Sequence, residues 1–286
     1  MTWICIRGPY RERLHLAGLR QLSDFMNFSG GKILKSLPSR TVLKVKLSSG
    51  GETKTFFIKR HRGKTSLWER GRTYLSGFSQ SPGRKEWDVI HLFQEHHIPT
   101  VIPVASGENL SGGWQESFVM TEELSPSFES LQVILEKYGP LPLTREKILE
   151  KRLLIRELSG LAGRMHAAGF NHRDFYCGHI FLRSRSPEER EWCILDLQRV
   201  DRRRWFRMRW IVKDLAALNY SAPPPLITLT DRLRFLQRYL GENSLREKRS
   251  LLRRIIQKTE QIRKHDQKLQ RRRSRAADAL SGSFSS

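Results

Sequence analysis

The chain has 286 residues, of which 38% are hydrophobic, so it is long enough for one large domain or a two-lobed unit with a substantial core. Its 52 Lys and Arg against 29 Asp and Glu give a formal net charge of +23, which indicates a strongly anionic partner. Its 3 cysteines are widely spaced and form no CxxC pair, which excludes a disulfide framework and a cysteine-based zinc site, and no segment has the apolar length of a membrane span. We therefore expect a globular protein of the reducing cytoplasm, and if it meets a membrane, it does so from the surface.

The first half of the chain has the pattern of a small, sheet-rich lobe. Apolar residues alternate with lysines and are followed by a Ser-Ser-Gly-Gly turn, which predicts an antiparallel hairpin. Residues 122–127, with a proline, are interpreted as a hinge between two lobes, and Glu122 at its start is assigned to nucleotide binding. The expected elements are strands over 41–47, 55–59 and 117–120 and a helix over 84–96.

The second half changes to helical periodicity. An apolar stripe predicts a long buried helix over 153–168, with Gly169 as its C-cap. The other expected elements are a strand over 192–195, helices from 214 and over 230–240, and a basic amphipathic helix over 246–275 with a disordered end. The predicted division is an N-lobe over 20–124, a catalytic C-lobe over 125–245 and a basic tail over 246–286.

Two aspartates stand where kinases place their catalytic and metal-binding carboxylates. His172, Arg173 and Asp174 follow the long helix directly, as the His-Arg-Asp catalytic loop does, and Asp174 is expected to accept the proton of the acceptor hydroxyl. Asp196 ends a buried strand, in the position of the magnesium-binding Asp-Phe-Gly aspartate. Alone, Asp196 is more simply a turn carboxylate, but the preceding triplet favours a metal ligand.

A lysine and a glutamate are candidates for holding the nucleotide. Lys59 closes an apolar strand, as the phosphate-binding lysine of kinases does, and Glu86 begins the next helix, where an ion pair with Lys59 is expected. The alternative for Lys59 is a basic surface strand, since further basic residues follow it. No glycine-rich loop is present, so Arg40 is assigned as an additional phosphate contact.

These segments together resemble the lipopolysaccharide kinase family, which phosphorylates Kdo or heptose sugars of the lipid A core. The residues that carry the resemblance are 58–61, 86–87, 98–100, 165–166, 169, 171–176, 194–200 and 213–218, within roughly 30–240. The resemblance implies an α+β, protein-kinase-like two-lobed fold, with a small sheet-rich N-lobe and a mainly helical C-lobe. It also implies a cytoplasmic enzyme, peripheral on the inner membrane, that uses ATP and Mg²⁺ to phosphorylate a sugar hydroxyl of the lipid-linked lipopolysaccharide inner core.

The same resemblance assigns roles to single residues. It makes Asp174 the catalytic carboxylate, Asp196 the metal ligand, Lys59 the nucleotide lysine and Asp214 a buried brace of the catalytic loop. His179 departs from the general kinase pattern, because protein kinases have there the asparagine that binds a second magnesium. We assign His179 to the metal site, although magnesium prefers oxygen ligands, and leave open whether one metal ion suffices, whether His179 contacts phosphate or whether the site is weakened.

Basic residues are concentrated in two segments of the chain. Five arginines and three aromatic residues interleave over 202–210, at the place of an activation loop, and suit an acidic sugar acceptor. The candidate acceptor contacts are Arg202, Arg203, Arg204 and Arg207, with a solvated basic loop as the alternative. The basic tail suits anionic lipid headgroups of the inner membrane.

Two other functions remain open at this point. One is a protein or small-molecule kinase of the same fold, although no Ala-Pro-Glu motif occurs between Asp196 and Asp214, which disfavours a protein substrate. The other is a pseudokinase-type binding protein that holds nucleic acid or anionic membrane, favoured by His179 and the missing glycine-rich loop. No sequence motif for nucleic-acid recognition is found, so no such partner is expected. The choice between Kdo and heptose, the acceptor hydroxyl and the oligomeric state stay open.

Overall fold

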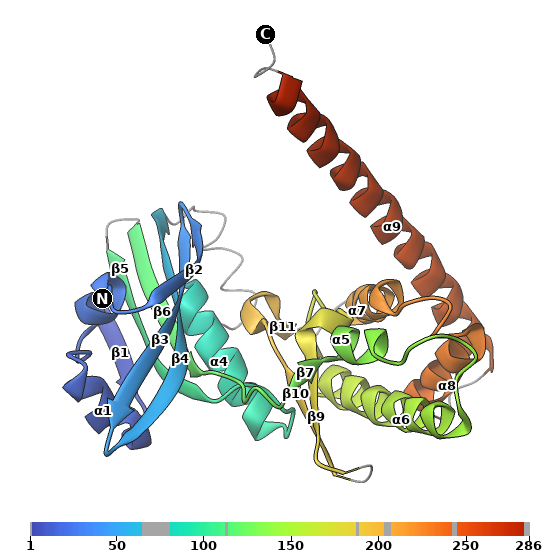
Figure 1. The fold of residues 1–286 in the computed structure, drawn as a ribbon, viewed down its shortest axis with the longest axis horizontal. Helices are drawn as coiled ribbons and strands as arrows, with labels where there is room; N and C mark the ends of the chain where they lie inside the picture. The colour runs from blue at the N-terminus through green and yellow to red at the C-terminus, as the bar shows by residue number, and fades with distance from the viewer. Residues whose placement is uncertain are drawn as a thin grey trace. The chain divides into compact units, whose positions relative to one another are not determined.

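The computed structural model of the chain describes residues 2–64, 81–111, 114–186, 189–202, 207–241 and 245–282. Two units can be separated, one with Met1–Glu129 and Ile180–Arg203, and one with Ser130–His179 and Arg204–Ser286. Unit 1 contains the large sheet, and unit 2 is mainly helical (Figure 1). Among the described residues, no helix is long and apolar enough to cross a membrane. The three-part division predicted from the sequence stays a prediction.

Unit 1 is built on an antiparallel sheet of six strands in the order β1-β5-β6-β4-β3-β2. The predicted hairpin is confirmed as β3 and β4, joined at Gly50 and Gly51, whose φ angles of 59° and 78° are easily reached only by glycine. The strands are β1 (Thr2–Ile6), β2 (Lys32–Leu37), β3 (Arg40–Ser49), β4 (Glu52–Lys64), β5 (Pro103–Ser111) and β6 (Trp114–Glu122).

Apolar residues on one face of this sheet pack against the N-terminal helices. Helices α1 (Arg11–Leu16) and α2 (Leu22–Asn27) supply Leu14 and Phe25, both fully buried, and Phe25 stacks on Phe118 with ring centroids 4.1 Å apart. The alternation of β3 and β4 sends every second side chain into this core. The side chains in between therefore point to the opposite face.

Helix α4 (Pro82–Glu95) packs on β5 and β6, and it corresponds to the helix predicted over 84–96. Its N-cap Ser81 accepts a hydrogen bond from the backbone of Arg84, and Pro82 occupies the first turn. Gly83 allows the close approach, because a Cβ there would lie 2.8 Å from backbone atoms of Phe118. The remaining elements of unit 1 are β9 (Ile180–Ser184), β10 (Arg190–Ile194), η1 (Gly8–Tyr10), η3 (Leu197–Arg199) and β11 (Asp201–Arg202).

Unit 2 contains the long helix predicted from the sequence, but that helix is longer than expected. It begins at Arg145, because Thr144 caps it by accepting a hydrogen bond from the backbone of Lys147, and Gly169 follows its end with a φ of 89°. The helices are α5 (Leu131–Glu136), α6 (Arg145–Ala167), α7 (Arg207–Ser221), α8 (Leu229–Leu240) and α9 (Leu245–Gly282), with short pieces β7 (Glu129–Ser130), β8 (Phe170–Asn171) and η2 (Cys177–His179).

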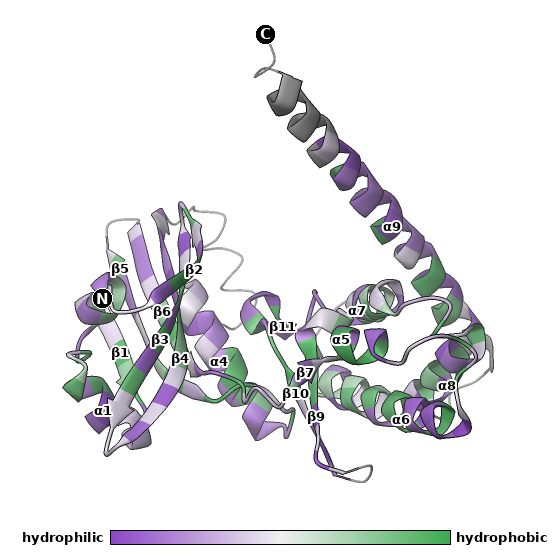
Figure 2. Cartoon of the chain, in the orientation of Figure 1, coloured by the Kyte–Doolittle hydropathy of each residue, from purple (hydrophilic) through white to green (hydrophobic). Residues whose placement is uncertain are grey.

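Helix α7 differs from its prediction, and helix α9 is tied to it. The sequence predicts a helix from Asp214, but α7 begins at Arg207, so part of the arginine-rich stretch is helical. Leu251 and Ile255 of α9 pack against α7, and Thr259 donates to the carbonyl of Ala216. Beyond this contact α9 exposes mainly hydrophilic side chains (Figure 2).

Candidate active site

The candidate nucleotide site in unit 1 centres on Lys59. Its ammonium lies 2.5 Å from Oε1 of Glu86, whose side chain is 3% exposed, and 4.0 Å from Oδ1 of Asp196, whose side chain is 39% exposed. One carboxylate is therefore buried with the lysine, and the other is open to solvent. Such a cation between two carboxylates suits phosphate groups and a metal ion together.

The position of Asp196 is set by the end of β10. Thr100 forms a parallel bridge with Ile194 and donates its hydroxyl to the Ile194 carbonyl at 2.7 Å, and the amide of Ile194 bonds to the carbonyl of Pro99 at 2.9 Å. Asp196 itself has a φ of 59°, a left-handed conformation that costs about 1–3 kcal/mol in a non-glycine residue and is typical of functional sites. The structure thus brings the predicted metal ligand to Lys59.

The basic residues beside Lys59 divide between the two faces of β4. Arg60 donates to the carbonyl of Phe28 at 2.5 Å, and Arg62 to Asn27, so both are fixed on the α2 side. Lys59 and His61 occupy alternate positions on the other face. This arrangement differs from the basic surface strand considered as the alternative for Lys59, in which all the basic side chains would be solvated.

Arg40 is paired with His61 in the β3–β4 register. His61 is 6% exposed, and burial, together with the charges of Arg40 and Lys59, lowers the pKa of its imidazole to about 4. Within the part of the chain that the structure describes, neither Nε of Arg40 nor Nε2 of His61 has a hydrogen-bond partner. The face that carries Lys59 therefore also presents an arginine and a neutral histidine.

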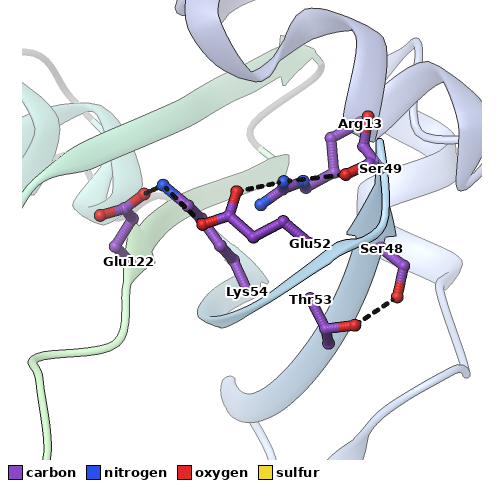
Figure 3. Close-up of polar contacts among 7 residues, drawn as sticks. All are labelled: Arg13, Ser48, Ser49, Glu52, Thr53, Lys54 and Glu122. Atoms are coloured by element: carbon purple, nitrogen blue, oxygen red, sulfur yellow. Dashed lines mark hydrogen bonds and ion pairs between the residues drawn. The ribbon is translucent and has the colours of Figure 1, made fainter.

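Glu122 lies at the end of β6, away from Lys59 in the strand register. Lys54 bridges its carboxylate at 3.3 Å and that of Glu52 at 3.9 Å, and Glu52 also binds Arg13 (Figure 3). Burial, followed by the hydrogen bond and charge of Glu122, raises the pKa of Tyr10 to about 12. The nucleotide role of Glu122 stays a prediction.

The candidate catalytic loop in unit 2 is held by Asp214. This fully buried carboxylate accepts hydrogen bonds from the backbone amides of His172 and Arg173 at 2.7 and 2.6 Å. Arg173 has a φ of 71°, so the loop is bent sharply just before Asp174. The two bonds fix the backbone that presents Asp174.

A buried histidine and a partly buried tyrosine complete the support of Asp214, and residue spacing alone does not predict them. Nε2 of His166 lies 3.3 Å from Asp214, and because a carboxylate only accepts, this nitrogen is the donor. Nδ1 forms a hydrogen bond with the hydroxyl of Tyr239 at 2.8 Å. Burial, followed by the charge of Asp214, raises the pKa of Tyr239. The Met-His pair in the family resemblance was the available signal for His166.

His179 contacts the catalytic loop through its backbone. Its Nδ1 lies 2.8 Å from the carbonyl oxygen of Asp174, and because a carbonyl only accepts, Nδ1 carries a proton. Metal-binding histidines often have their second nitrogen fixed in this way. The role of His179 as a metal ligand stays a prediction.

The arginines proposed for the acceptor have different positions. Arg207 donates to the backbone carbonyl of His166, and Arg202 is exposed in β11. Arg203 and Arg204 lie outside the described residues. Of the predicted acceptor contacts that the structure describes, Arg207 therefore binds the protein backbone, whereas Arg202 is open to solvent.

The fold is that of a protein-kinase-like phosphotransferase. A solved structure of WaaP in complex with acyl carrier protein aligns with 91% of this chain and 98% of that chain, with 29% identity and a TM-score of 0.69. The α+β, protein-kinase-like fold expected from the sequence is thereby confirmed.

The family follows from the sequence comparisons. The model of the lipopolysaccharide kinase (Kdo/WaaP) family matches residues 32–239, and the chain belongs to this family. It is 33% identical over 258 residues to the lipopolysaccharide core heptose(I) kinase WaaP of Pseudomonas aeruginosa, which covers 87% of this chain and 90% of that protein. It is 31% identical over 241 residues to the enzyme of the same name from Escherichia coli, which covers 82% and 88%.

Membership confirms the enzyme class predicted from the sequence. The protein is an ATP-dependent kinase that phosphorylates a sugar hydroxyl of the lipopolysaccharide core. The pseudokinase and protein-kinase alternatives are not favoured.

Proposed function

We propose that this protein transfers the γ-phosphate of ATP to a hydroxyl of an inner-core heptose, at the cytoplasmic face of the inner membrane. The choice of heptose over Kdo rests on the names of the two curated relatives described above. The proposed catalytic role of Asp174 rests on one observation: the backbone amides of His172 and Arg173 donate hydrogen bonds to the buried Asp214 and so fix the loop before Asp174.

The groups of unit 1 would hold the nucleotide. Glu86 keeps Lys59 extended in a fixed position, and a cation so placed neutralises charge on the transferring phosphate. Arg40 and Glu122 would add contacts to the nucleotide. His61, neutral in the protein, is able to donate a hydrogen bond without adding charge.

Asp174 would act on the acceptor. Its carboxylate orients the sugar hydroxyl and accepts its proton as the oxygen bonds to the γ-phosphorus. The bond between that phosphorus and the β,γ-bridging oxygen breaks at the same step, and ADP leaves. The catalytic contribution of the protein is then chiefly position and charge.

Magnesium fits one of the two predicted ligands better than the other. Asp196 offers an exposed carboxylate, which suits a cation that binds phosphates, water and one or two carboxylates. The imidazole of His179 is a poorer ligand for this hard cation, although Nδ1, not Nε2, is the nitrogen that contacts the Asp174 carbonyl. The ion would supply charge neutralisation at the β- and γ-phosphates.

The test uses the full chain with Mg²⁺ and labelled ATP on deacylated core glycan. Wild type should label the glycan, and Asp174→Asn should lose nearly all transfer while keeping its circular dichroism and ATP affinity. Wild type that labels no core glycan would refute the proposed function. A fully active Asp174→Asn would refute the role of Asp174 alone.

Helix α9 is the proposed contact with the membrane. Residues 246–275 hold 13 Lys or Arg and 3 Asp or Glu, a balance of 13 − 3 = +10, and Arg253 and Arg254 among them are exposed. Flotation with vesicles containing anionic phospholipid should recover the protein at low salt and lose it at high salt. Equal recovery with neutral vesicles would contradict an electrostatic contact.

An acyl carrier protein is a second proposed partner, because the solved relative was determined with one. The observation that favours it is an apolar cavity of about 100 Å³ in unit 2, lined among others by Leu154, Leu215 and Phe235. Such a cavity has room for a few methylene groups of an acyl chain. Acylated carrier protein should therefore raise the thermal midpoint of this protein, and the unacylated carrier should not.

A further inference from the structure

One face of helix α7 carries both the brace of the catalytic loop and an aromatic ring. Trp210 lies four residues before Asp214, which places the two side chains on the same side of the helix. Asp214 binds the backbone amide of Arg173, and the Arg173 guanidinium lies over the Trp210 ring, with Cζ 5.2 Å from the centroid. Trp210 is thus tied to the residue that directly precedes Asp174.

Two further cations gather on the same ring. Nζ of Lys213 lies 5.5 Å from the Trp210 centroid, and Cζ of Arg209 lies 5.9 Å from it. Arg209 is exposed, and Lys213 and Trp210 are partly exposed, so solutes have access to them. The first turn of α7 contains no acidic residue. The cations around this ring would attract a bound anion.

This cluster combines cations with an aromatic ring. Arg207, in the first turn of the same helix, donates instead to the backbone carbonyl of His166. Guanidinium and ammonium groups bind carboxylates and phosphate esters, and the indole offers an apolar plane to the C–H face of a sugar ring. A sugar that carries an acidic group matches both properties.

We propose that Arg209 and Lys213, gathered around Trp210 beside Arg173, form a subsite for an acidic group of the acceptor glycan. The acidic group is a carboxylate or a phosphate ester on or next to the sugar that receives phosphate. This inference rests on the proposed function, because it assumes a glycan acceptor. The subsite sets specificity for the acceptor and takes no part in proton transfer.

A purely structural role of the cluster predicts different kinetics. If the cations only steadied Arg173 and the catalytic loop, their loss would lower kcat for every acceptor and lower the hydrolysis of ATP by water. A subsite role instead raises the KM for an acidic acceptor and leaves both of those rates unchanged.

The experiment compares two double variants of the full chain on soluble, deacylated core glycan. Arg209→Gln with Lys213→Gln removes two charges from the cluster. Arg152→Gln with Arg156→Gln removes two charges from an exposed part of α6 in the same unit and serves as the matched control. The three acceptors are the native glycan, the glycan with methyl-esterified carboxylates and the glycan treated with phosphatase.

For the native glycan we expect the first double variant to raise the acceptor KM about tenfold or more, because hydrogen bonds to a charged group are lost. Its kcat, its KM for ATP and its ATP hydrolysis without glycan should match the control. The KM difference should disappear with one neutralised acceptor, which identifies the carboxylate or the phosphate ester as the group bound.

Three results would overturn the inference. A KM equal to that of the control shows that the cluster does not bind the acceptor, while the proposed function stands. A KM difference that persists on both neutralised acceptors, or a matching loss of kcat and ATP hydrolysis, shows a structural role. Wild type that phosphorylates none of the three glycans removes the proposed function and this inference together.

Discussion

Replacing Asp214 by Asn is the most direct test of how the catalytic loop is held. The carboxylate receives three donors, from the amides of His172 and Arg173 and from Nε2 of His166. An amide side chain has one oxygen and an NH₂ group, so at least one backbone N–H would face another donor. The loss of one hydrogen bond to a charged group costs about 1.5–3 kcal/mol, and a buried N–H without a partner costs about 1–3 kcal/mol.

We therefore expect Asp214→Asn to lower the free energy of unfolding by about 2.5–6 kcal/mol, a large part of the 5–15 kcal/mol typical of folded domains. Because Asp174 follows these amides directly, kcat should fall about a hundredfold even where the variant is folded. Urea unfolding followed by tryptophan fluorescence, with kcat at saturating ATP, measures both effects.

Asp266→Asn is the matched control, because Asp266 also accepts two side-chain hydrogen bonds, from Tyr220 and Gln270, but on the partly exposed surface of α9. It should lose no more than about 1 kcal/mol and keep its kcat. If Asp214→Asn behaves like this control in both measurements, the hypothesis that Asp214 holds the catalytic loop is refuted.

Three further predictions concern other contacts. Lys59→Met leaves the buried Glu86 without its cation, so calorimetry should show ATP binding at least about tenfold weaker, and unchanged affinity would exclude Lys59 from the nucleotide site. His179→Asn supplies an oxygen ligand, so activity should saturate at a lower Mg²⁺ concentration, and an identical Mg²⁺ titration would count against metal binding. Lys151→Met should cost about 1.5–3 kcal/mol in urea unfolding at pH 7, because the buried Asp231 loses its charged hydrogen-bond donor and keeps only Arg234 and Thr228 as partners. Burial alone would raise the pKa of Asp231, but hydrogen bonds from Lys151 and Thr228 outweigh it and hold that pKa below its usual range. Its contribution is therefore complete above the unfolded pKa of about 3.9 and is lost as the pH falls through the folded value, so a cost that does not shrink below about pH 4 would refute the assignment.

The sequence predicted those parts of the fold that local pattern determines. Alternation and paired glycines indicate the β3–β4 hairpin, and the apolar stripe with Gly169 indicates α6. Helices α1 and α2 were missed because each has only six residues, and the burial of Leu14 and Phe25 depends on a sheet assembled from later parts of the chain. The start of α7 was missed because arginines and tryptophan do not form an apolar stripe.

The residues of the site also divide into those that a local pattern reveals and those that depend on distant parts of the chain. His172, Arg173, Asp174 and Asp196 belong to short motifs, so spacing alone finds them. Tyr239 reaches His166 from another helix, 73 residues along the chain, and no local pattern signals such a contact. Arg60 and Arg62 lie on one face of β4 and Lys59 on the other. This placement depends on the alternation and register of the strand, which a run of basic residues in the sequence does not reveal.

The contact between α9 and α7 decides how the basic C-terminus can be dissected. Leu251, Ile255 and Thr259 are buried, and Asp266 is tied to Tyr220 of α7. A chain shortened before these residues would expose the helix that carries Asp214, so its inactivity would not distinguish lost membrane binding from a displaced catalytic loop. Deletions that begin after Asp266 leave every one of these contacts in place and separate the two effects.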